Sequence, residues 1–108
     1  MKQVIITTTP TVAGKEIKEV IGIVRGSTIR SKHLGRDIMA GLKSIVGGEL
    51  KGYTEMINES RDEAIKRLEQ HAKEVGADAV VNVRLSSTAV MQNAAEVLAY
   101  GTAVRFKK

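Results

Sequence analysis

The chain has no cysteine and no tryptophan, and its only aromatic side chains are Tyr53, Tyr100 and Phe106. Without cysteine, neither a disulfide framework nor a thiolate metal site can form. With so few aromatic residues, the core has to be built from Val, Ile, Leu, Ala and Met. The missing residues therefore exclude the disulfide-rich and cysteine–zinc classes of small protein.

Long hydrophobic runs are missing as well. No stretch approaches the ~20 apolar residues that a membrane helix needs, and the opening MKQVIITTTP has neither the apolar region nor the cleavage site of a signal peptide. We therefore expect a cytoplasmic protein without a membrane partner. Its 108 residues, 43% hydrophobic and 27% charged, fit one folded domain over residues 1–108.

The formal net charge of +5 raises the question of nucleic-acid binding. The densest basic segment contains Arg25, Arg30, Lys32 and Arg36. No aromatic residue is interleaved with these side chains, so nothing in the segment supports base stacking. We interpret it as a solvated surface that an anion could still reach, and we do not expect a nucleic-acid partner.

The first half of the chain predicts two strands and a helix. Residues 3–9 are rich in β-branched side chains, which favour a strand, and the following PTVAGK indicates a turn. Residues 16–28 predict a second strand that becomes apolar on both faces, which is typical of a strand covered on both sides. Apolar residues then recur with helical period over 36–46, and two glycines end that helix.

A long amphipathic helix is predicted over residues 49–75, with an apolar stripe at the helical period. Strands follow over 78–88, where Arg84 falls on the polar face, and over 95–106. The order ββααββ indicates two adjacent hairpins that form one antiparallel sheet with helices packed on one face. This is an α+β fold.

The second face of the predicted sheet has no cover. Val97, Ala99 and Ala103 lie on the small-residue face of the last strand, and Val20 and Val24 add to it. Small residues permit another backbone or subunit to approach closely, and a chain of this size has nothing left to bury them. We therefore expect this face to pack against identical subunits in a homo-oligomer.

Two polar residues of the long helix, Arg61 and His71, project into its apolar stripe on a helical wheel. A charged arginine there needs a partner. One interpretation of Arg61 is an ion pair with Glu96 or Asp78, and the other is an anion clamp at a subunit junction. His71 is either a structural contact of the helix or of subunits, or an acid–base group.

No catalytic or metal-binding motif stands out. His33, in the predicted loop SKHLGR, is interpreted as a surface residue. No Ser or Asp stands at a spacing that argues for a triad with either histidine, and no HxH, HxxxH or HExxH motif occurs. Gly14-Lys15 resembles the end of a P-loop but lacks the other residues of that motif. The residues therefore define neither a catalytic group nor a metal site.

Four short motifs occur in a fixed order and spacing. They are GGE at 47–49, ESRDEA at 59–64, GADAVV at 76–81 and AYGTAV at 99–104. Together they resemble the YbjQ-like family, whose members are often described as heavy-metal-binding proteins. The resemblance extends from about Val4 to Val104, and the family often has glycine where this chain has Asn82.

The resemblance implies a small α+β subunit, similar in class to dodecin-like folds, that assembles into a ring-shaped homopentamer. It implies no established catalytic activity. The family description makes a metal ion a candidate cofactor, yet no metal ligand of the family can be matched to a residue here. A ring could still combine one His or Glu from each subunit into a shared site.

Two functional hypotheses follow. The first is a non-enzymatic oligomeric protein that binds a small ligand or a metal ion, with Arg61, His71 and Tyr100 as candidate ligand-binding residues. The second is an enzyme that acts on an anionic small molecule, in which Arg61 holds the anion and His71 transfers protons. Neither hypothesis assigns a cofactor.

Overall fold

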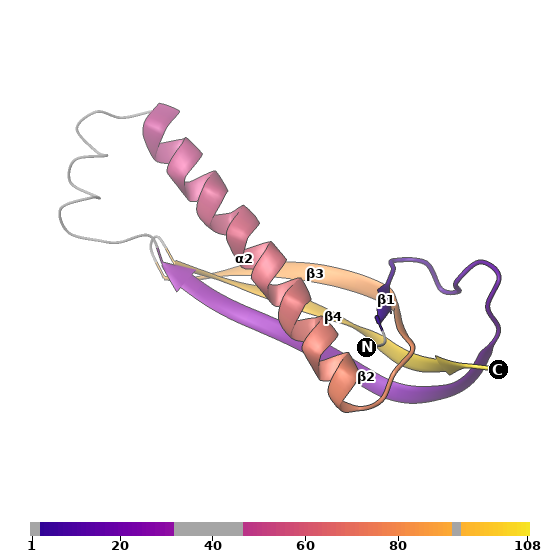
Figure 1. The fold of residues 1–108 in the computed structure, drawn as a ribbon. Helices are drawn as coiled ribbons and strands as arrows, with labels where there is room; N and C mark the ends of the chain where they lie inside the picture. Colours follow the sequence, from indigo (N-terminus) through magenta and orange to yellow (C-terminus); the bar gives the residue numbers. More distant parts are fainter. Residues whose placement is uncertain (1–2, 32–46, 92–93) are drawn as a thin grey trace.

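The computed structural model describes residues 3–31, 47–91 and 94–108, in which the chain forms four strands and one helix (Figure 1). These elements are β1 (Ile5–Ile6), β2 (Ile17–Ser31), α2 (Gly47–Glu74), β3 (Ala79–Met91) and β4 (Ala94–Phe106). The predicted α+β class is confirmed, and so are the long helix and the last two strands. The predicted helix over 36–46 lies outside the described residues, as do Lys32, His33 and Arg36.

The sheet is mixed rather than antiparallel, which corrects the predicted pair of hairpins. Its strand order is β1-β3-β4-β2. The short β1 runs parallel to β3, whereas β2 and β3 each pair antiparallel with β4. A strand as long as β2 needs a long partner for its backbone groups. Strand β4 pairs with it from Ile17 to Ser31, which the two residues of β1 could not do.

Helix α2 packs on β2 and β4 through small residues. Six side chains of α2 and β4 are completely buried in one core cluster: Ala64, Leu68, Ala72, Val97, Ala99 and Ala103. The backbone of α2 passes so close to β2 that a Cβ on Gly26 would overlap the backbone of Ala64 and Leu68. The prediction that this small-residue face stays open is therefore wrong, because the backbone that it admits is that of the helix.

The open face of the sheet is the one that carries Tyr100. Side chains alternate along the paired strands, so Ile23, Ile29 and Tyr100 point away from α2. Ile23 is 78% exposed and Ile29 is 66% exposed. Of the two β2 residues expected on the open face, Val20 is exposed and Val24 is buried. An uncovered face thus exists, on the side opposite to the one predicted.

A second, smaller core covers only one end of this outer face. There Val12, from the loop before β2, packs with Val104 and Phe106. The molecule is elongated, with extents of 59 × 24 × 22 Å and a radius of gyration of 17.5 Å, whereas a compact chain of this length has about 13 Å. No helix in the described part of the chain combines the length and apolarity that crossing a bilayer requires.

Strand β3 changes register against β4 between Val81 and Arg84. Asn82 stands in this irregularity with a φ of 55°. That is the left-handed region, which glycine adopts freely and asparagine better than most other residues. The N–H of Asn82 also donates to the carbonyl of Thr9 at 3.0 Å. The asparagine therefore keeps a backbone conformation that a glycine at this position would adopt.

Replacing Gly26 with alanine should lower the free energy of unfolding by ~1–3 kcal/mol, because the added methyl group would force α2 away from the sheet. Urea unfolding followed by circular dichroism would measure the change. Ser27→Ala, on the open face one residue along the strand, is the control and should change stability by no more than ~0.5 kcal/mol. Equal stability of the two variants would show that α2 does not need this close approach.

Replacing Asn82 with valine should destabilise the fold by ~1–2 kcal/mol, because a β-branched side chain fits the left-handed region poorly. Asn82→Gly is the matched control and should unfold close to the wild-type temperature. Thermal unfolding of both variants would test this expectation. A valine variant that is as stable as the glycine variant would mean that Asn82 does not hold this conformation in solution.

Candidate functional site

Arg61 lies on the exposed side of α2, which corrects its predicted inward position. Its Nη1 donates to Oδ1 of Asn58 at 3.3 Å, one turn earlier on the same helix. The buried stripe of α2 runs through Met56, Ser60 and Ala64 at a spacing of four residues, so Ser60 takes the position toward the sheet. Within the described part of the chain, the partner of Arg61 is therefore an amide rather than the predicted carboxylate.

His71 contacts the outer edge of β2. Its Nδ1 accepts a hydrogen bond from the backbone N–H of Arg25 at 3.2 Å and lies 3.3 Å from the carbonyl oxygen of Arg25. One turn earlier, Nη1 of Arg67 donates to the carbonyl of Ser27 at 2.6 Å. Because β2 is an edge strand, these side chains satisfy backbone groups that another strand could otherwise bind. The structural interpretation of His71, as a contact between helix and sheet, is confirmed.

Tyr100 lies on the open face of the sheet and is 40% exposed. Its neighbours on the adjacent strands are Arg25 of β2 and Arg84 of β3. Since α2 packs on the opposite face, the fold of one chain does not bring Tyr100 together with Arg61 or His71. The three predicted ligand-binding residues occupy three different environments, and a ligand role for each stays a prediction.

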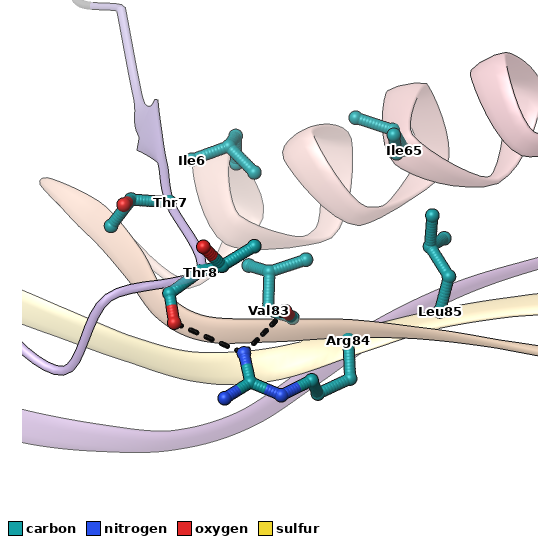
Figure 2. A pocket seen from close by; sticks show the side chains of 7 residues that line it. All are labelled: Ile6, Thr7, Thr8, Ile65, Val83, Arg84 and Leu85. Atoms are coloured by element: carbon teal, nitrogen blue, oxygen red, sulfur yellow. Dashed lines mark hydrogen bonds between the residues drawn. The ribbon is translucent and has the colours of Figure 1, made fainter.

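A hollow of about 570 Å³ opens beside β3 at the point where β1 ends (Figure 2). It exists because β1 stops at Ile6 and because α2 lies mainly over β2 and β4, which leaves β3 with little helical cover. Leu85 shows the effect, since it lies on the helix side of the sheet and is still 43% exposed. The hollow is lined by Ile6, Thr7, Thr8, Ile65, Val83, Arg84 and Leu85.

Arg84 borders this hollow, but its side chain leaves β3 on the open face of the sheet, opposite to Val83 and Leu85, and is fixed there by the backbone. Its Nη1 donates to the carbonyl of Thr8 at 3.0 Å and to the carbonyl of Val83 at 2.9 Å (Figure 2). Its Nε and Nη2 have no hydrogen-bond acceptor among the described residues. Sequence reasoning placed Arg84 on the polar face of a strand and gave it no role. The sequence feature that sets Arg84 apart is that it is the one charged residue in the run AVVNVRLSSTAV.

The described residues do not fit a heavy-metal site within one chain. In the ranges 3–31, 47–91 and 94–108, no group of three or more His, Cys, Asp or Glu side chains could hold an ion. Soft metals prefer thiolate and imidazole ligands. The chain has no cysteine, and Nδ1 of His71 is engaged by the backbone of Arg25. A single subunit therefore offers no such ligand set in this region.

A family model described as "Putative heavy-metal-binding" matches residues 4–107. The chain belongs to this YbjQ-like family. Two relatives, both named UPF0145 protein, show how close the relationship is. The protein of Psychromonas ingrahamii is 58% identical over 104 residues, which cover 96% of this chain and 99% of the relative. That of Archaeoglobus fulgidus is 57% identical over 106 residues, 98% of each chain. These names state no activity, substrate or metal.

A crystal structure of a protein of unknown function from Pediococcus pentosaceus, assigned to the DUF74 family, has a similar fold. The two chains are 20% identical and superimpose with a TM-score of 0.65, over 96% of this chain and 98% of that chain. At this level of identity the likeness concerns the fold alone. It agrees with the α+β architecture of the YbjQ-like subunit and assigns no ligand to it.

Replacing His71 with alanine should lower the free energy of unfolding by ~0.5–1.5 kcal/mol, because the N–H of Arg25 would lose its acceptor. Denaturant unfolding would measure the loss. Lys73→Ala, at an exposed position two residues along the helix, is the control and should leave the unfolding midpoint unchanged. If both variants unfold at the same denaturant concentration, the contact of His71 with β2 does not stabilise the fold.

Proposed function

We propose that this YbjQ-like protein is a non-enzymatic homo-oligomer, a ring of five subunits, that binds a small ligand or a metal ion. The observation that carries this proposal is the open face of the sheet. Val20, Ile23 and Ile29 of β2 are 65%, 78% and 66% exposed on that face. Aliphatic side chains that gather on one surface mark an interaction site, and burying each of them fully would contribute ~1.5–3 kcal/mol.

The architecture supports burial against another copy. A sheet with one helical layer has a second face to bury, and the short core around Val12 covers only one end of it. The molecule is 59 Å long and 24 and 22 Å across in the other two directions, so this face is long and narrow. In a ring, one surface of each subunit meets a different surface of the next, so every open face finds a cover.

A metal ion held by the described residues would need ligands from more than one chain, since these residues of a single chain include no ligand cluster. A small organic ligand has no such requirement, because the hollow beside β3 exists within one subunit. The enzymatic alternative gains no support from the geometry. Arg61 is on the exposed side of α2 and bonds Asn58, and His71 is engaged at the edge of β2.

Native mass spectrometry of untagged protein, purified without chelator, should show a species of five times 11.7 kDa. Ile23→Lys should shift the protein to smaller species, because it places a charge on the open face. Gln70→Lys, on the exposed side of α2, is the matched control and should keep the assembly. A monomeric wild type, or an Ile23→Lys variant that assembles normally, would contradict the proposal.

The same spectra weigh any ligand that the assembly retains. An extra mass on the wild type that is absent from a folded Ile23→Lys variant would support binding at a junction between subunits. A metal would add the mass of the ion and would be removed by chelator. Protein that carries no metal after expression with several metals present would eliminate the metal-binding form of the proposal and leave the small-ligand form.

A further inference from the structure

We infer that the free edge of β3, residues 85–89, pairs with the same edge of a second copy of this chain. The two strands run antiparallel and are related by a two-fold axis at Ser87. This contact uses the edge of the sheet and not its open face, so it goes beyond the proposed ring and does not depend on it.

The outer edge of β3 is occupied only along its first half. There β1 pairs with the first two residues of β3, and the N–H of Val83 donates to the carbonyl of Thr7 at 3.0 Å. Because alternate residues of a strand direct their backbone groups to the same edge, those of Leu85, Ser87 and Ala89 also point outward. On that side they have no hydrogen-bond partner among the described residues (Figure 1). Such an edge is a template for pairing with another strand.

The opposite edge of the sheet, formed by β2, is not open in the same way. Nδ1 of His71 accepts a hydrogen bond from the N–H of Arg25, and Nη1 of Arg67 donates to the carbonyl of Ser27. These two side chains of α2 occupy the middle of that edge. Among the described strands, the strand of a second copy that offers matching backbone groups is therefore β3 again.

The sequence LSSTA over residues 85–89 is complementary to itself in the antiparallel direction. With the axis at the central serine, Leu85 lies opposite Ala89 of the partner subunit, and Ser86 lies opposite Thr88 of the partner subunit. Opposed residues share a face of the sheet, so apolar side chains meet on the helix side and hydroxyl groups meet on the open side. The outward backbone groups of the two strands would form about six hydrogen bonds.

The contact also covers apolar surface that one chain leaves exposed. Leu85, Val90 and Met91 are 43%, 47% and 63% exposed. In this pairing the end of one β3 reaches the part of the other where β1 has stopped and the hollow opens, so apolar side chains from both copies come together. Arg84 lies opposite Val90 of the partner subunit and ~20 Å from the partner's Arg84. Like charges are therefore not opposed.

Charge substitutions at the axis test the contact. Ser87 is exposed, and Ser87→Lys places two like charges opposite each other. In native mass spectrometry, Ser87→Lys and Ser87→Glu should each halve the mass of the wild-type species. An equimolar mixture of the two should restore it, because Lys then faces Glu, and a misfolded variant would not recover in this way. Gln70→Lys adds the same charge on α2 and should keep the wild-type mass. Variants that keep the wild-type mass, or a mixture that does not restore it, would overturn the inference.

The masses separate this contact from the proposed ring. A wild-type species of ten times 11.7 kDa that falls to five times in Ser87→Lys supports both. A dimer that falls to a monomer supports the contact and contradicts the ring. A pentamer that Ser87→Lys leaves unchanged supports the ring and overturns the contact. A monomeric wild type contradicts both.

Amide hydrogen exchange locates the contact on the sheet. In the wild type the amides of Leu85, Ser87 and Ala89 should be protected as that of Val83 is, and Ser87→Lys should remove this protection. Free exchange at these amides in the associated wild type would assign the contact to another surface and overturn the inference. Protection that arises only when an extended peptide of alternating Val and Thr is added would also overturn it, since the edge would then accept a strand from another protein.

Discussion

The close contact between the backbone of α2 and the small-residue face of β2 and β4 sets the arrangement of the other parts of the molecule. A side chain on Gly26 would overlap the helix backbone, and Ala99 and Ala103 beneath the helix are completely buried. Small residues on one face allow the helix to lie directly on the sheet. The resulting core is thin and needs no large aromatic side chain, which agrees with a chain that has only three.

The position of α2 over β2 has opposite consequences at the two sides of the sheet. At the β2 edge, His71 and Arg67 bond backbone groups of Arg25 and Ser27, so the helix protects that strand from pairing with another chain. At the β3 side, the helix leaves an apolar hollow where β1 has already ended. The placement of one helix thus closes one edge and creates the candidate binding site at the other.

The family description and the geometry bear on function in different ways. YbjQ-like proteins are described in terms of heavy metals, whereas the described residues of this chain hold no group of three or more His, Cys, Asp or Glu side chains that could bind an ion. Assembly decides how far these two views can be reconciled, because a ring brings together groups that one chain holds apart.

Local sequence patterns were enough to predict the helix over 49–75, the last two strands and the α+β class, because apolar periodicity and turn residues act over short distances along the chain. They also predicted that one face of the sheet lacks a cover. Which strands pair was decided by the tertiary structure: β4 pairs with β2 along its whole length, whereas β1, with two residues, pairs with β3. Which face of the sheet the helix covers depended on how closely two backbones can approach at Gly26.

The inward position predicted for Arg61 was wrong, because Ser60 occupies the buried stripe of the helix instead. The position of Arg84 could not be inferred from its neighbours, since it is held by Thr8, which lies 76 positions away in the sequence and reaches Arg84 only in the folded chain.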